Sequence, residues 1–357
     1  MLGDGSKTAK AWATQSKERK YRKDEGRMSQ RQQVGIAGAG HYVPERVIAN
    51  SYFEEFLDTS DEWIVKRTGI SERRYAAENE ATSDLCIHAA KMALEHAGVR
   101  AQDLDLIVVG TITPDQILPH VAPQVQAAIG ANKAAAFDVA AACTGFITAL
   151  SVGESYIAAG HGKNVLVIGA ETLSRFLDIE DRTSCILFGD GAGAVVLRAQ
   201  EPGGPGEILK LSLGSDGEGY DFIRVEGGGS RRPVSQATLD QRQHFIRVMG
   251  RDVYRFAVTT MTRTVEEMLE GYEHEKDLSL VVPHQVNQRI IDASVEKLGI
   301  PTSKVMININ KFGNTSAASC AIALSEAIHE NRIERGKLLV MCAFGAGLNW
   351  GGALVRW

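Results

Sequence analysis

Short, continuous apolar runs that alternate with helical segments constrain the fold of this chain most strongly. After a first strand expected from Val34, three runs have the length and composition of strands buried on both faces of a sheet. They are residues 104–111 (LDLIVVGT), 134–141 (AAAFDVAA) and 164–169 (NVLVIG). Helices are expected from an N-cap at Ser83 to Gly98, and from Cys143 to about Ala159. This alternation predicts an α/β protein.

A weak internal repeat relates the two halves of the chain. The segment DLIVVG from Asp105 resembles LSLVVP from Leu278 at an offset of 173 residues, and GKNVLV from Gly162 resembles GKLLVM from Gly336 at an offset of 174. The turn-rich segment EPGGPG separates the halves. The predicted division is a first half over residues 34–205 and a second half over residues 206–357.

The repeat predicts where side chains from the two halves meet. Cys143 lies where a strand of the first half passes into a helix. His284 follows the matching strand of the second half, and Asn314 lies just before a helix there. A pseudo-two-fold arrangement would bring these strand ends together, and loops after strand ends are where α/β sheets place their sites.

Composition excludes several classes of protein. A length of 357 residues allows a large core, and a net charge of −5 argues against binding to nucleic acid. No apolar run has the roughly 20 residues that a membrane span needs, so no membrane partner is expected. The five cysteines are an odd number without a CxxC pair, and no secretory signal precedes them. Reduced thiols in a cytoplasmic protein without a metal site are expected.

The amino-terminal 33 residues differ from the rest of the chain. They hold nine Lys/Arg, four acidic residues and almost no apolar periodicity, which predicts a disordered basic tail over residues 1–33. The simplest interpretation is an inert tail, or an over-long start of the sequence, because Met28 precedes the folded region. A transit peptide and a basic docking arm are alternatives, and the four acids count against the transit peptide.

Three polar residues could form a catalytic site. A thiol at Cys143, on the first turn of a helix, would have its thiolate stabilised by the helix N-terminus and by a neighbouring histidine. An imidazole at His284 and an amide at Asn314 could stabilise an acyl thioester and then an enolate. Each also has a structural interpretation: a buried inert cysteine, a packing histidine and an N-capping asparagine. The absence of a P-loop and of a GxGxxG motif disfavours nucleotide hydrolysis and hydride transfer.

Five motifs together resemble one family. FDVAAACTGF around Cys143, PHQVN around His284 and GNTS around Asn314 resemble the active-site motifs of β-ketoacyl-acyl-carrier-protein synthase III. TSDEWIVKRTGI around Trp63 and FGDGAG from Phe188 are the fourth and fifth. The likeness runs from about residue 34 to residue 357.

The resemblance implies a fold and a reaction. The fold would be thiolase-like, a five-layered, internally duplicated αβαβα arrangement, usually a homodimer. Cys143 would take an acyl group from acyl-CoA. His284 and Asn314 would hydrogen-bond the thioester carbonyl of malonyl-acyl-carrier protein, and the backbone N–H groups of Cys143 and Ala346 would bind the oxyanion. The products would be a 3-oxoacyl-carrier protein, CoA and CO2, the first condensation of type II fatty-acid synthesis, with acyl-CoA a substrate and no cofactor.

The resemblance also implies binding residues. The CoA groove would be formed by Trp63, Arg67, Arg182 and Asn287. A basic face for the acidic carrier protein would be formed by Arg255, Arg289 and Lys297, although Glu296 departs from the doubly basic pattern of some members.

Leu118 would line the acyl pocket of the partner subunit. Acetyl-preferring members often carry a phenylalanine at that position, so longer or branched primers are expected. The turn at residues 345–347 reads Gly-Ala-Gly where many members have three glycines, which preserves a backbone donor.

Other Cys-His-Asn enzymes remain alternatives. They include polyketide-type and hydroxymethylglutaryl-CoA synthases and ketosynthases of secondary metabolism. A papain-like protease has the same residue order, but its cysteine signature is missing here. A non-catalytic protein on this fold would have no need of all three residues.

Overall fold

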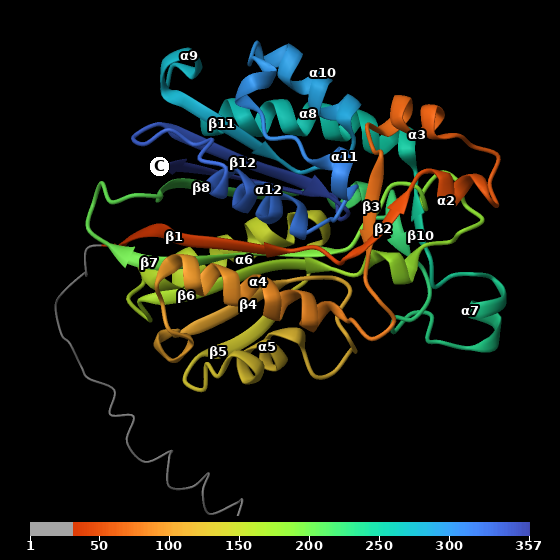
Figure 1. Ribbon diagram of the computed structural model, residues 1–357, viewed down its shortest axis with the longest axis horizontal. Coiled ribbons are helices and arrows are strands. Elements are labelled where there is room, and N and C mark those ends of the chain that lie inside the picture. Colours follow the sequence, from red (N-terminus) through yellow and green to blue (C-terminus); the bar gives the residue numbers. More distant parts are fainter. Residues whose placement is uncertain (1–30) are drawn as a thin grey trace, which may run out of the picture. The chain divides into compact units, whose positions relative to one another are not determined.

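The two halves of the chain build their strands in the same order. In the computed structural model, which describes residues 31–357, nine strands follow the order β5–β4–β6–β7–β1–β8–β13–β12–β11 (Figure 1). Their bounds are β1 Gln33–Tyr42, β4 Leu106–Gly110, β5 Ala135–Val139, β6 Asn164–Glu171, β7 Gly191–Gln200, β8 Glu207–Ser215, β11 Leu278–Pro283, β12 Leu338–Gly345 and β13 Asn349–Arg356. A single residue pair, Gly35 with Glu207, joins β1 to β8. Each half therefore contributes its own group of strands.

Strand directions confirm the internal duplication. In the first half, β5, β4 and β6 are parallel, and β7 is antiparallel to both β6 and β1. In the second half, β11 and β12 are parallel, and β13 is antiparallel to both β12 and β8. A parallel bridge between Val281 and Val305 stands in the place of the β5 pairing.

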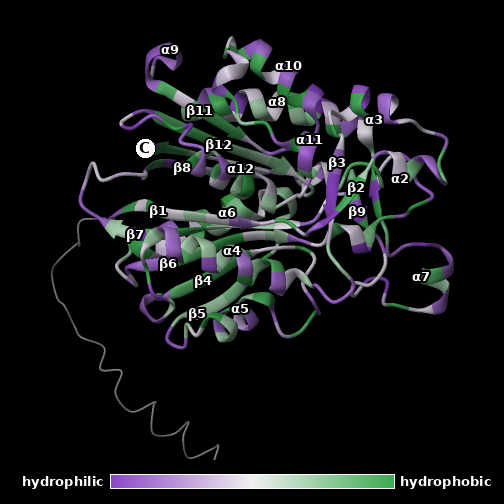
Figure 2. Cartoon of the chain, in the orientation of Figure 1, coloured by the Kyte–Doolittle hydropathy of each residue, from purple (hydrophilic) through white to green (hydrophobic). Residues whose placement is uncertain are grey.

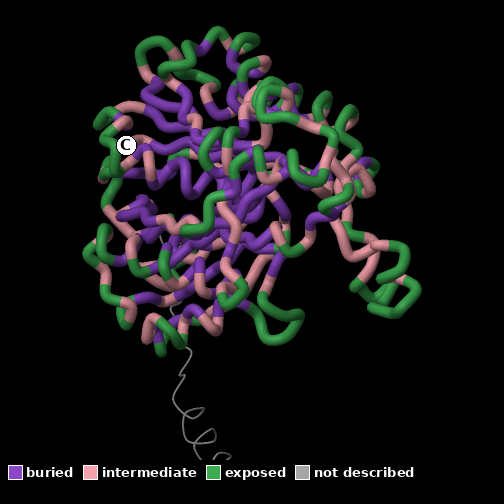
Figure 3. The backbone as a smooth tube through the Cα atoms, turned by 45° about the vertical axis from the view of Figure 1, so that its right-hand side comes forward, coloured by how far each residue is buried: buried purple, intermediate pink, exposed green. Residues whose placement is uncertain are grey.

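Helices and strand groups form five layers, as the resemblance predicted. The helices are α4 (Thr82–Ala97) and α5 (Val121–Ile129) on the outer face of the first strand group, α6 (Gly145–Ala158) and α12 (Ala318–His329) between the groups, and α8 (Gly250–Met268) and α10 (Gln288–Leu298) on the outer face of the second (Figure 1). Three apolar clusters fill the interfaces, and the strands and the two central helices carry most of the buried chain (Figures 2 and 3). Burial of these apolar faces is what holds the layers together.

Most of the shorter elements lie at one end of the layers, whereas α9 (His274–Asp277) lies at the opposite end, where β11 begins (Figure 1). The others are β2 Arg46–Ala49, α2 Ser51–Glu54, α3 Asp61–Thr68, β3 Glu72–Tyr75, β9 Ile223–Val225, α7 Gln236–Asp240, β10 Ile246–Val248 and α11 Ile309–Phe312. Five 3-10 turns complete the described chain: η1 Ala101–Asp103, η2 Ala142–Thr144, η3 Leu173–Phe176, η4 Gly217–Gly219 and η5 Thr302–Lys304.

The structure corrects two details of the sequence-based prediction. Helix α4 begins at Thr82, and Ser83 lies inside its first turn, where Asp115 accepts hydrogen bonds from its backbone N–H (2.9 Å) and its hydroxyl (2.7 Å). Strand β5 is an edge strand with Ala135 and Phe137 exposed, so it is not buried on both faces. An exposed apolar edge strand is typical of a strand that pairs with another chain.

The predicted tail lies mostly outside the described residues. Residues 1–30 are not described, whereas Arg31 pairs with Glu154 (2.7 Å) and Gln33 begins β1. Within residues 31–357, no helix is long and apolar enough to cross a membrane. The same residues contain no group of His, Cys, Asp and Glu side chains arranged to hold a metal ion.

Candidate active site

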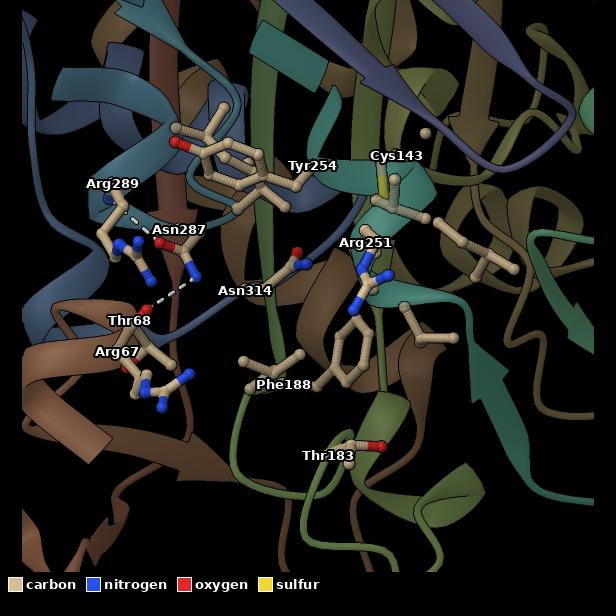
Figure 4. Close-up of a pocket in the computed structure, with 18 of the residues that line it drawn as sticks. Arg67, Thr68, Cys143, Thr183, Phe188, Arg251, Tyr254, Asn287, Arg289 and Asn314 are labelled. Carbon is tan, nitrogen blue, oxygen red and sulfur yellow. Dashed lines mark hydrogen bonds between the residues drawn. The ribbon is translucent and has the colours of Figure 1, made fainter. Parts of the chain in front are cut away.

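One cavity contains all three predicted catalytic residues. It has a volume of about 720 Å³, and Cys143, His284 and Asn314 line it together. Figure 4 shows Cys143 and Asn314 at this cavity. The three residues come from η2, from the end of β11 and from the loop before α12. Strand ends from the two halves thus meet in one place, as the repeat predicted: Cys143 follows β5, and His284 follows β11, the counterpart of β4.

Cys143 is held at the entry to helix α6. Ala142 before it has a φ of 46°, a left-handed conformation that a residue with a Cβ rarely adopts. Cys143 is partly exposed, while the other four cysteines are buried. Burial of the sulfur raises the pKa of Cys143 to about 11, although a hydrogen bond from Ser316 lowers it. The resting group is therefore a thiol, because desolvation outweighs the stabilisation of the thiolate that the helix N-terminus was expected to provide.

His284 is fully buried and presents one free nitrogen. Its Nδ1 lies 2.5 Å from the Ser319 hydroxyl, and its ring packs edge-on against Phe344. Its Nε2 has no hydrogen-bond partner among the described residues. Burial lowers the pKa of His284 to about 3, so the imidazole is neutral. An unsatisfied buried nitrogen that lines a cavity is suited to a polar ligand atom.

The amide of Asn314 is oriented by its own loop. Its backbone N–H donates to the Leu187 carbonyl (2.8 Å), and its backbone carbonyl accepts from Gly189 (3.0 Å). Its side-chain Oδ1 accepts the backbone N–H of Ser316 at 2.9 Å. Because Oδ1 is engaged, Nδ2 is the donor that remains for a ligand.

The turn after β12 passes directly over the thiol. A Cβ added to Gly345 would lie 2.7 Å from the Cys143 Cβ and 3.0 Å from its Sγ. Ala346 follows in the turn, and its backbone N–H donates to no backbone acceptor among the described residues. The backbone of residues 345–347 is thus close enough to Cys143 to contribute an oxyanion donor.

Trp63 lies among arginines at the same cavity. Helix α3 begins at its N-cap Ser60, whose hydroxyl accepts the Trp63 N–H at 3.1 Å. The guanidinium carbons of Arg67 and Arg182 lie 5.2 and 4.9 Å from the centre of a Trp63 ring. Such cation–π contacts hold planar positive groups against an aromatic face.

The side chain of Asn287 is already engaged. It caps α10 by accepting the Arg289 backbone N–H at 3.0 Å, and it donates to the Arg67 carbonyl at 3.1 Å (Figure 4). Asn287 lines the cavity, but its first task is to hold α10 against α3. Any contact with pantetheine would compete with these bonds.

The cavity mouth is basic. Five arginines line it and, among the described residues, no acidic side chain does; the arginines are Arg67, Arg182, Arg251, Arg255 and Arg289. Arg251 was not anticipated from the sequence. Tyr254, beside it, lies under the Arg289 guanidinium, 6.0 Å from ring centre to Cζ. Lys297 is exposed on α10 and does not line the cavity.

Leu118 lies away from this cavity in the described chain. It is 79% exposed, and the neighbouring Ile117 is 84% exposed. Two adjacent, almost fully exposed aliphatic side chains are unusual for a lone subunit.

Three residues that support the site escaped the sequence analysis. Glu171, Ser316 and Ser319 are buried around Cys143 and His284. Glu171 ends a strand that the sequence identified, so a carboxylate after a buried apolar run was its available signal. The two serines follow Asn314 within a segment of small residues, and no sequence signal marked them.

Comparison with known proteins is consistent with this geometry. The family model described as 3-oxoacyl-[acyl-carrier-protein (ACP)] synthase III matches residues 137–217, and the model of its C-terminal part matches residues 271–357. The β-ketoacyl-[acyl-carrier-protein] synthase III of Clostridioides difficile (strain 630) is 48% identical over 325 residues, covering 91% of this chain and 98% of that protein.

Solved structures share the fold over nearly the same length. The crystal structure of 3-oxoacyl-[acyl-carrier-protein] synthase III from Aquifex aeolicus VF5 has 45% identity and a TM-score of 0.83, covering 91% of this chain and 100% of that one. The priming β-ketosynthase of the R1128 polyketide pathway has 34% identity and a TM-score of 0.85, covering 93% and 98%. The chain described here belongs to the β-ketoacyl-acyl-carrier-protein synthase III family of thiolase-fold condensing enzymes.

Proposed function

We propose that this enzyme joins an acyl-CoA primer to malonyl-acyl-carrier protein by decarboxylative Claisen condensation, with Cys143 carrying the acyl group. The free Nε2 of His284 is the observation that carries the proposal. A buried donor without a partner lies in the same cavity as a partly exposed thiol and an oriented amide. A thioester carbonyl between Nε2 of His284 and Nδ2 of Asn314 would accept two hydrogen bonds, which strengthen as it becomes an enolate.

The reaction would proceed in two halves. Cys143 attacks the acyl-CoA thioester, the N–H groups of Cys143 and Ala346 bind the oxyanion, and CoA leaves. Malonyl-carrier protein then loses CO2 while His284 and Asn314 stabilise the enolate, and its carbon attacks the acyl-Cys143. The neutral state of His284 suits this role, because it donates a hydrogen bond without supplying an acid that would protonate the carbanion.

CoA would occupy the basic end of the cavity. Its adenine would stack at Trp63 with Arg182, and its phosphates would pair with neighbouring arginines such as Arg67. The pantetheine arm would pass Asn287 toward Cys143. No cofactor or metal enters this scheme.

The acidic carrier protein would dock on the face formed by Arg255, Arg289 and Lys297. Charge reversal at Lys297, which does not line the cavity, should raise the KM for malonyl-carrier protein in a salt-dependent manner and leave acylation by acyl-CoA unchanged. Reversal at Arg255 or Arg289, which line the cavity that CoA would occupy, should affect both steps. Arg100→Glu, at an exposed arginine away from the cavity, is the matched control. An unchanged KM would place the docking face elsewhere.

A homodimer is proposed from the exposed apolar surface of the first half. The edge strand β5 and the aliphatic pair Ile117–Leu118 would be covered by the second subunit. Sedimentation equilibrium tests this directly, since a monomer at micromolar concentration would exclude it. We also propose a cytoplasmic location and the domain division at residues 205 and 206, which falls in the loop between β7 and β8.

Release of labelled CO2 from malonyl-carrier protein tests the reaction. Wild-type enzyme should release CO2 in a primer-dependent manner, and Cys143→Ser should abolish condensation. If malonyl-CoA alone serves as extender, the enzyme acts as a polyketide-type synthase. This is the alternative that the similarity to the R1128 priming ketosynthase supports. If neither extender is decarboxylated by the wild type, the proposal is wrong.

A further inference from the structure

A buried carboxylate that the condensation chemistry does not use lies behind Cys143. Glu171, the last residue of β6, has no exposed surface. Its carboxylate accepts hydrogen bonds from Thr113 Oγ1 (2.6 Å), Thr111 Oγ1 (3.2 Å), the Ile112 N–H (3.2 Å) and Ser316 Oγ (3.4 Å). Within residues 31–357 no cationic side chain pairs with it, which is costly for a buried charge.

The two threonines are arranged to donate. Thr111 Oγ1 accepts the Thr113 N–H at 3.1 Å, and Thr113 Oγ1 accepts the Thr172 N–H at 2.9 Å. Each hydroxyl thus accepts one backbone N–H and donates its own proton to Glu171. These bonds favour the carboxylate while burial opposes it, and the balance raises the pKa of Glu171 to about 7. Both protonation states are therefore accessible near neutral pH.

Ser316 connects this carboxylate to the thiol. Its hydroxyl donates to Glu171 at 3.4 Å and lies near enough to Cys143 to lower the pKa of the thiol. Its backbone is fixed by a φ of 48° and by the bond from its N–H to Asn314. The negative charge of Glu171 also raises the pKa of the buried Cys86 thiol on α4, after burial and the nearby Asp138 and Asp115.

We propose that Glu171 stores the thiol proton of Cys143 between the two half-reactions, exchanging it through the Ser316 hydroxyl. This inference rests on the proposed condensation and adds to it the fate of the proton. Glu171 acts through Ser316 and touches no substrate, so it is a positioning residue.

The proton balance closes without a water path to Glu171. In acylation the S–H bond of Cys143 breaks, the sulfur bonds the acyl carbon, and the proton passes through Ser316 to the carboxylate. CoA leaves as a thiolate and takes a proton from solvent at the cavity mouth. In condensation the new C–C bond forms, CO2 departs and the sulfur–acyl bond breaks. The leaving sulfur then recovers the proton from Glu171, so each cycle consumes one solvent proton.

Single-turnover acylation across pH tests the relay. Labelled acyl-CoA is mixed with excess enzyme without malonyl-carrier protein, and transfer to Cys143 is timed between about pH 5.5 and 9. A thiol acting alone should react about tenfold faster per pH unit up to its pKa near 11. The relay instead predicts a rate that rises to about pH 7 and is then level, because the ionised carboxylate takes the proton.

Variants separate the relay from a structural effect. Glu171→Gln and Ser316→Ala should each lose the level region and slow acylation at pH 7 by roughly tenfold or more. Glu171→Asp should restore part of the level region. Thr113→Val removes one hydrogen-bond donor to Glu171 but keeps the relay. The pH at which the acylation rate becomes level should therefore be higher in this variant.

The outcomes are distinct. The relay is overturned if the acylation rate of Glu171→Gln or Ser316→Ala is still level above about pH 7. It is also overturned if the rate of the wild type is not level there. If Glu171→Gln does not fold, Ser316→Ala decides, because it leaves the carboxylate in place. If no acyl-CoA acylates wild-type Cys143, the proposed function itself fails, whereas rapid acylation independent of Glu171 rejects only the relay.

Discussion

The hydroxyl of Ser319 lies 2.5 Å from Nδ1 of His284, and the same oxygen accepts the Gln285 backbone N–H at 3.2 Å. Because the oxygen already accepts one hydrogen bond, its proton is available to Nδ1. When the Ser319 hydroxyl donates to Nδ1, the imidazole proton lies on Nε2, which has no hydrogen-bond partner among the described residues. Ser319 therefore selects the tautomer that can donate to a thioester carbonyl.

Removing this hydroxyl should impair condensation but not acylation. Ser319→Ala is expected to slow CO2 release about tenfold, as the loss of one buried hydrogen bond predicts, while acylation of Cys143 keeps its rate. Ser325→Ala is the matched control, because Ser325 makes a similar bond to Nδ1 of His41 at 2.9 Å on the same helix, α12. Equal effects of the two substitutions would contradict the tautomer role.

A side chain at position 345 should block the nucleophile. The Cβ of Gly345→Ala would meet the Cβ of Cys143 at 2.7 Å, so the turn or the cysteine must move. Acylation is expected to fall by roughly 100-fold, since about 1 Å of misplacement costs that much. Gly217→Ala adds its Cβ in open space and should leave acylation unchanged. Normal acylation of Gly345→Ala would show that the turn yields freely.

Cys143 should be the first thiol to react with iodoacetamide, because the other four cysteines are buried. In Glu171→Gln, which lacks the proposed relay, the rate should rise about tenfold per pH unit up to about pH 11, since the thiolate is the reactive form. Mass spectrometry of peptides after brief labelling measures this. Cys143→Ser should show almost no labelling, and faster modification of any other cysteine would refute the assignment.

The neutral His284 should make the fold sensitive to acid. The unfolded chain takes up a proton at this residue near pH 6.5, whereas the folded chain does so only near pH 3. The unfolded state therefore binds more protons in that window, and the free energy of unfolding should fall as pH drops from about 6.5 toward 3. In His284→Gln the slope should be less steep by up to about 1.4 kcal/mol per pH unit. Urea unfolding at several pH values measures it, and an unchanged slope would contradict burial of a neutral imidazole.

Leu118 should widen the range of primers. In a homodimer this exposed leucine would line the partner's acyl pocket, where it leaves more room than phenylalanine. Leu118→Phe is expected to lower kcat/KM for C4–C6 and branched primers relative to acetyl-CoA. Ile117→Phe, at the equally exposed neighbour, should leave the preference unchanged. A wild type that turns over acetyl-CoA at least as well as the longer primers would rule the idea out.

The sequence by itself predicted the α/β architecture, the duplication and the meeting of Cys143 with His284 and Asn314. These follow from local patterns, because apolar runs mark buried strands and polar residues after strand ends mark the site edge of a sheet. The five-layered arrangement and the CoA and carrier residues came instead from the motif resemblance.

Only the tertiary structure decided how those residues are protonated and held. The helix N-terminus of α6 was expected to stabilise the thiolate of Cys143, but desolvation of the buried sulfur is the larger effect. Packing also keeps His284 neutral and places Glu171 and Ser316 behind the thiol. Burial depends on which distant segments close over a group, and no local pattern of residues contains that information.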